Sequence, residues 1–215
     1  MNGAKLMMRL APLALLLISS AAAAGPFEEA MTILKDGHTL SSQAGEAEQK
    51  LRAAIQAEPS HVHAHYNLGL LLARKGDTAG ARATWQRVVT VDSGYLPAKA
   101  RLAELDLVGA AKESAKQRLE AIVEQERFQP EARNALAALA IEAKDWESAI
   151  KHARNVLLGD PENINAYLNL ALAYYHQGLT DQAWLITRSA LDRREDAAAL
   201  HNIMGLIYLR KDDSR

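Results

Sequence analysis

Three histidines at alternate positions come nearest, by residue type and spacing, to a chemical site in this chain. His61, His63 and His65 could supply imidazole ligands to Zn²⁺ or Ni²⁺. Their segment reads as the start of a helix, in which His61 and His65 share one face and His63 points elsewhere. No His-Glu-x-x-His motif accompanies them. We therefore expect histidines with structural roles and no metal site, with metal binding as the alternative.

The sequence carries no other pattern of catalytic residues. Acidic pairs such as Glu46 with Glu48 fall in segments that read as solvated helix, and neither a phosphate-binding glycine loop nor a G-x-S-x-G motif occurs. Cysteine is absent, which excludes disulfides, thiolate metal sites and cysteine nucleophiles. The 25 basic and 26 acidic residues give a net charge of −1, so nothing favours nucleic-acid binding. We expect a protein that is not an enzyme and uses no cofactor.

The elements that position these residues are expected to be helices. Hydrophobic residues make up 49% of the chain but aromatic residues only 5%, so the apolar mass is largely alanine and leucine. Those two are the best apolar helix formers. The 12 glycines and 6 prolines are too few for a turn-rich β protein.

Residues 1–24 have the three parts of a secretory signal peptide. Lys5 and Arg9 precede an apolar run from Leu10 to Ile18, and the small residues that follow end in Ala22-x-Ala24. The run is too short to cross a bilayer as a helix. Cleavage before Gly25 would leave a mature chain of 25–215 with no transmembrane segment. We expect export to a Gram-negative periplasm, with secretion or surface display as the second option.

The remainder of the chain repeats with a period of 34 residues. Ala47 recurs as alanine at each following step, and Leu34 recurs as leucine until a methionine replaces it. The two series are Ala47, Ala81, Ala115, Ala149, Ala183, and Leu34, Leu68, Leu102, Leu136, Leu170, Met204. An ordinary helical bundle has no reason to keep such a period, whereas stacked repeats require it.

Each repeat reads as a helix, a turn and a second helix. In residues 62–95 apolar residues recur at helical spacing before and after Lys75-Gly76-Asp77. Gly76 suits a helix end and Asp77 can cap the next helix. A small residue follows the repeated leucine, as Gly69 does here, so that the two helices can approach closely.

This pattern resembles the tetratricopeptide repeat, whose consensus is W-x2-L-G-x2-Y, then A-x3-F, then P. One unit matches it through Tyr167, Leu170, Ala171, Tyr174, Gly178, Ala183 and Ala190. The resemblance implies an all-α, right-handed solenoid of helix hairpins. The units would run over about 28–61, 62–95, 96–129, 130–163 and 164–197, with a partial unit at 198–215.

In proteins that this sequence resembles, the first helix of each unit faces a concave groove that binds peptides. The positions that would face it carry asparagines, which can hold a peptide backbone through donor and acceptor together, and tyrosines, which add contact area. The candidate partner-binding residues are His63, Tyr66, Asn67, Arg101, Asn134, Asn165, Asn169, Tyr175, His176 and Asn202.

The resemblance implies a scaffold that binds a protein or peptide partner in an envelope complex, such as secretion, pilus, motility or wall-assembly machinery. The alternative is the repeat arm of a larger envelope protease or glycan-processing enzyme whose catalytic part is not in this chain. The last unit has one helix, Ala198 to Arg210, and no second helix to cover it. We therefore also expect self-association through this C-terminal end.

Overall fold

The computed structural model describes residues 25–35, 41–108 and 110–213. The expected signal peptide, residues 1–24, lies outside these ranges. The described residues form α-helices and contain no β-strand, which confirms the all-α fold. None of their helices is both long and apolar enough to cross a membrane.

Consecutive helices pack as hairpins along the chain. The helices are α1 (Pro26–Lys35), α2 (Ser41–Ala57), α3 (Val62–Arg74), α4 (Thr78–Val91), α5 (Leu96–Leu105), α6 (Lys112–Gln125), α7 (Pro130–Glu142), α8 (Trp146–Gly159), α9 (Ile164–His176), α10 (Thr180–Leu191) and α11 (Ala198–Asp213). The hairpins pair α1 with α2, α3 with α4, and so on to α9 with α10, and α11 then packs on α9 and α10.

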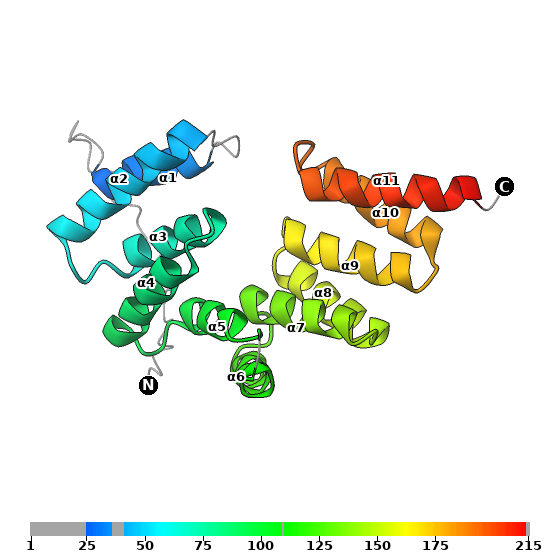
Figure 1. Cartoon of the computed structure of the whole chain (residues 1–215), viewed down its shortest axis with the longest axis horizontal. Helices are drawn as coiled ribbons and strands as arrows, with labels where there is room; N and C mark the ends of the chain where they lie inside the picture. The colour runs from blue at the N-terminus through cyan, green and yellow to red at the C-terminus, as the bar shows by residue number, and fades with distance from the viewer. Residues whose placement is uncertain (1–24, 36–40, 109, 214–215) are drawn as a thin grey trace, which may run out of the picture.

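The hairpins follow one another along an open arch (Figure 1). The first helices α3, α5, α7 and α9 lie toward its inner side, and α6 stands on the outer side. Neighbouring first helices from α5 to α11 are in contact, so they form a continuous inner surface. Below, the inner side of the arch, from α3 to α11, is called the inner face.

Short polar side chains and left-handed turns set the hairpin boundaries. Asp77 and Asp145 precede α4 and α8, and each accepts a hydrogen bond from a backbone amide of the first turn. This satisfies one of the amides that have no partner within the helix. The turns before the second helices reach positive φ at Gly76 (83°), Lys144 (59°) and Gly178 (82°), which are related by the 34-residue period.

The repeated small residues lie where the two helices of a hairpin meet. The five alanines of the series from Ala47 to Ala183 are fully buried. A Cβ atom on Gly69 would overlap the indole of Trp85 on the paired helix α4, so no larger residue fits there. The 34-residue period in the sequence therefore reflects the close contact between the two helices, which recurs once in each hairpin.

The third hairpin is more open than the others. Helix α5 ends at Leu105 and α6 begins only at Lys112, whereas three residues separate α3 from α4. The two helices also contact each other less extensively than the helices of the hairpins on either side. Ala110 and Ala111 occupy the repeat positions of Gly76 and Asp77, and Ala111 supplies no capping side chain. Alanine disfavours the left-handed turn conformation, so the two signals for a tight turn are missing together.

Candidate functional site

A cluster of aromatic and charged side chains lies on the first half of the inner face. The Tyr66 ring meets that of Tyr95 edge-on, with centroids 5.4 Å apart, and Tyr95 also contacts the ring of His63. The Tyr66 hydroxyl donates a hydrogen bond to Glu131 on α7 over 3.1 Å. Tyr66 is buried and His63 is exposed. Within this cluster, His63 and Tyr95 are therefore more accessible to a partner than Tyr66.

Charged groups surround Tyr66. Arg101 on α5 donates to the carboxylate of Glu104 over 2.8 Å, and Glu131 also accepts from the amide of Gln129. Burial raises the pKa of the Tyr66 hydroxyl, and the negative charge of Glu131 raises it further, while Arg101 acts in the opposite direction. Tyr66 therefore stays protonated and keeps its role as a hydrogen-bond donor.

An asparagine network joins α7 to α9 on the second half of the inner face. The Asn134 amide donates to the Asn163 side chain over 3.1 Å, and Asn169 donates to the backbone oxygen of Asn134 over 3.2 Å. The Asn163 oxygen also accepts from the amide of Ala166 and caps α9. Asn134 and Asn169 thus have intramolecular partners that a ligand would have to displace.

Two aromatic contacts lie at the C-terminal end of this surface. The guanidinium of Arg210 on α11 stacks over the Tyr175 ring, 3.7 Å from its centroid, and donates to the Tyr175 backbone oxygen. His176 stacks on Trp146 of α8, with centroids 5.4 Å apart and planes 13° from parallel. Tyr175 therefore holds α11 against α9.

The remaining candidates differ in how free their side chains are. Asn67 donates to the backbone oxygen of His63 within its own helix. Asn165 and Asn202 are exposed, as are His63 and His176. Asn165 and Asn202 therefore carry the amides among these candidates that are most accessible to a partner.

The N-cap side chains of the first helices form a further row, of which sequence analysis had singled out only His61. His61, Tyr95, Gln129 and Asn163 each occupy the N-cap position of a first helix. Tyr95 and Asn163 both reach back to the preceding first helix, where they contact Tyr66 and Asn134. The four residues are spaced by 34, so the same period that predicts the hairpins could have identified them.

The three histidines near the start of α3 have separate environments. His61 caps the helix by accepting from Ala64, and its ring packs on Phe27. His65 is buried with Nε2 3.0 Å from the Pro59 oxygen, whereas His63 contacts Tyr95. Within the described ranges no three His, Asp or Glu side chains are grouped to hold a metal ion. These geometries favour the structural roles over a metal site.

Family comparison agrees with the repeated hairpins. Two tetratricopeptide-repeat models match, one over residues 41–95 and the other over 140–207, which together cover more than half of the chain. The chain belongs to the tetratricopeptide repeat (TPR) family. The part between the matches, 96–139, contains the open third hairpin. No curated protein matches the chain by sequence.

Solved structures share the TPR solenoid at low sequence identity. TTC0263, a TPR protein from Thermus thermophilus, is 15% identical with a TM-score of 0.70, over 86% of this chain and 97% of its own. Human IFIT1, crystallised as a dimer with m7Gppp-AAAA, is 14% identical with a TM-score of 0.70, over 87% and 46%. The Cut9–Hcn1 hetero-tetramer of the APC/C matches at 18% identity and a TM-score of 0.68, over 87% and 36%. The chain thus spans about a third of that last relative, and these likenesses establish the solenoid fold.

Proposed function

We propose that this TPR protein is an exported, non-enzymatic scaffold that binds a protein partner along its inner face in a bacterial envelope complex. The repeats themselves support a role in protein–protein interaction. The observation that supports this choice of surface is the run of contacting first helices from α5 to α11, two of which carry exposed asparagines, Asn165 on α9 and Asn202 on α11.

The chemistry of the inner face favours a polypeptide ligand. Exposed asparagine amides can donate and accept together, as a peptide backbone requires. The N-terminal cluster contains the carboxylates of Glu104 and Glu131, which would repel a phosphate backbone. An RNA ligand such as that in the IFIT1 structure therefore has no support from this surface.

Export rests on the signal-like segment at residues 1–24 and the cleavage pattern at Ala22-x-Ala24. Cell fractionation with N-terminal sequencing tests it. We expect the protein in the periplasmic fraction with Gly25 as its first residue. Recovery in the cytoplasm with Met1 intact would contradict both the signal and the compartment.

The partner is tested by crosslinking in cells and recovery from envelope extract. We expect proteins that co-purify with the parent to be lost with the variant Asn165→Ala/Asn202→Ala. Lys151→Ala, an exposed change on α8, serves as the control. Loss in the control but not in the asparagine variant would move the interface away from the inner face.

We also propose that α11 mediates self-association with a second copy of the chain. Gly205 has the same repeat position as Gly69, yet a Cβ built there meets no described atom within 4 Å beyond its chain neighbours and the nearby backbone of its own helix, while Trp85 fills that space at Gly69. Leu206 (43% exposed), Tyr208 (56%) and Leu209 (66%) flank it. A helix can therefore cover this surface as α4 covers α3. We propose that this helix is α11 of a second copy, because its own Gly205 also allows close approach.

Light scattering tests this self-association. We expect a dimer for the parent and a monomer for Leu206→Glu/Leu209→Glu. Leu158→Glu, at a leucine that is 72% exposed on α8, should leave the dimer intact. A monomeric parent at high concentration would overturn this proposal without affecting the inner-face proposal.

A further inference from the structure

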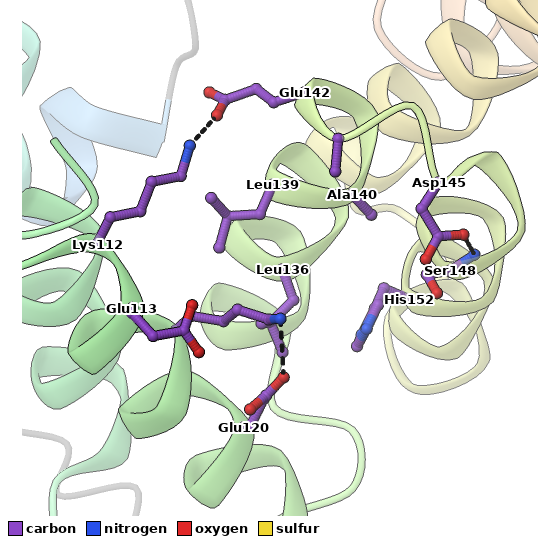
Figure 2. A pocket seen from close by; sticks show the side chains of 12 residues that line it. Lys112, Glu113, Glu120, Leu136, Leu139, Ala140, Glu142, Asp145, Ser148 and His152 are labelled. Carbon is purple, nitrogen blue, oxygen red and sulfur yellow. Dashed lines mark hydrogen bonds and ion pairs between the residues drawn. The ribbon is translucent and has the colours of Figure 1, made fainter.

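The open third hairpin leaves a cleft on the opposite side of the first helices from the asparagine network. The cleft measures about 510 Å³ and lies between α6, α7 and α8 (Figure 2). Neither Asn134 nor Glu131, which mark the inner face of α7, is among its lining residues. It is therefore a second surface, separate from the groove proposed above.

The cleft has an apolar floor that comes from α7. Leu136 and Ala140 are largely buried, and Leu139 is half-buried between them. Ala143, at the end of α7, also lines the cleft and is exposed. Small alanines beside leucines leave room for an incoming apolar side chain. The volume falls within the ~300–1,000 Å³ of typical ligand sites.

The rim of the cleft is acidic. Four carboxylates and two ammonium groups line it. Lys112 pairs with Glu142 across the mouth over 2.6 Å (Figure 2), and Lys116 lies 3.8 Å from Glu120. Both ammonium groups are thus matched by carboxylates. The remaining acids, Glu113 and Asp145, leave the rim with a net negative charge.

The histidine in the cleft does not offset this charge at neutral pH. Burial, together with the positive charge of Arg133, lowers the pKa of His152 to about 4. The Asp145 pKa is also lowered, because its side chain is hydrogen-bonded to Ser148 at the start of α8. The cleft therefore combines an apolar floor with a rim that attracts cations.

We propose that this cleft binds a short segment of a partner protein in which one or two apolar residues are flanked by lysine or arginine. The apolar residues enter between α6 and α8 onto Leu136 and Leu139, and the flanking cations face Glu113 and the neighbouring carboxylates. Charge complementarity selects this occupant over an acidic or uncharged segment.

The test is a synthetic peptide array in which Leu, Met or Phe anchors are flanked by Lys or by Glu, probed with the mature chain. We expect binding of Lys-flanked members and a loss of affinity of about tenfold or more between low and high salt. Glu-flanked members should bind at least tenfold more weakly. Equal binding of the two sets, or no binding of any member, would overturn the proposal.

Matched variants locate the binding. Glu113→Lys should weaken the Lys-flanked peptides at least fivefold, while Glu147→Lys should change their binding less than twofold. Glu113 and Glu147 are exposed residues at the same repeat position of α6 and α8, and only Glu113 lines the cleft. Equal effects of the two reversals would show that binding reflects general charge alone and would contradict the assignment.

A second pair of variants tests the apolar floor. Ala143→Trp fills the cleft and should abolish peptide binding, whereas Ala138→Trp, on an exposed part of α7 outside the cleft, should not. A second copy of the chain is the competing occupant of the cleft, and sedimentation of the same variants measures whether such a dimer forms. A dimer that Ala143→Trp dissociates would show that a second copy fills the cleft, and would overturn a partner segment as its ligand.

Discussion

The hydroxyl of Tyr66 on α3 donates a hydrogen bond to the carboxylate of Glu131 on α7, 3.1 Å away and 65 residues along the chain. The bond spans the unit that contains α5, the one whose hairpin is open. It therefore holds the arch together across the inner face at the point where packing within the third hairpin is weakest.

Replacing Tyr66 by phenylalanine should lower the free energy of unfolding by about 1–2 kcal/mol. The change removes a hydrogen bond to a charged acceptor while keeping the buried ring. Tyr95→Phe is the control, because the Tyr95 hydroxyl lies 3.4 Å from His63 and has little bond to lose. Urea denaturation checks both. Equal stabilities of Tyr66→Phe and the parent would show that the bond does not hold the arch.

The same tyrosine predicts a loss of stability at alkaline pH. The pKa of Tyr66 is raised in the folded chain, so above a pH of about 10 the unfolded chain releases this proton while the folded chain keeps it. Its contribution to stability is therefore complete below a pH of about 10 and falls above it. Denaturation over a pH series that crosses this value should show a shallower fall for Tyr66→Phe than for the parent. Parallel profiles for the two proteins would contradict the raised pKa.

His152 predicts a loss of stability on the acid side. Its pKa is lowered from 6.5 to about 4, because burial and the nearby Arg133 disfavour the charged imidazole. Between those values the unfolded chain takes up a proton that the folded chain refuses, so stability is lost as the pH falls from 6.5 toward 4. His152→Gln should reduce this loss in thermal melts across the window. Equal pH dependence of stability in His152→Gln and the parent would mean that the His152 imidazole is solvated in the folded chain.

Ala149→Phe should destabilise the fourth and fifth hairpins. Ala149 is fully buried in a cluster with Ala140 and Ala173 from the flanking first helices. Forcing a ring into that contact costs about 1–3 kcal/mol or more, and loss of one repeat also weakens its neighbours. Far-UV circular dichroism melts check it, with Ala138→Phe at an exposed site as control. A parent-like melt would mean that these helices do not meet at Ala149.

Two glycines at one repeat position should respond in opposite directions to alanine. Gly69→Ala places a methyl group against the Trp85 indole and should cost about 1–3 kcal/mol. Gly205→Ala meets open space among the described residues and should gain about 0.5–1 kcal/mol of helix stability in the monomer. Hydrogen exchange of α3 and α11 measures both. A loss at Gly205 comparable to that at Gly69 would mean that α11 is already covered.

The hairpins were predictable because close helix approach requires a small residue on each helix of the pair, as at Gly69 and Ala81 in one repeat. The open third hairpin was not predicted, although Ala110 and Ala111 carry its signal. The residue type at one turn position does not alter the helical periodicity on either side, so the pattern still predicts an ordinary hairpin there. Lys144 shows the difficulty, since it reaches positive φ without glycine while Asp145 caps the next helix.

The helices that carry the candidate residues were predictable, but the contacts of their side chains were not. The periodicity correctly identified first-helix residues, but it could not show that Asn169 bonds to the backbone of Asn134 on the neighbouring first helix. Side-chain partners depend on which rotamers meet across a helix–helix contact, and no spacing rule encodes that. Tyr95 and Asn163 were missed because they precede the helices, outside the positions that a helical pattern covers.

The central claim is that a partner binds the inner face. The most direct test is to measure how much partner each inner-face variant recovers from crosslinked envelope extract. Asn165→Ala/Asn202→Ala removes two exposed amides worth about 0.5–1.5 kcal/mol per hydrogen bond, so recovery should fall about tenfold while helicity is unchanged. Lys151→Ala should recover partners as the parent does. Full recovery by the asparagine variant, with loss in the Lys151 control, would contradict partner binding at the inner face.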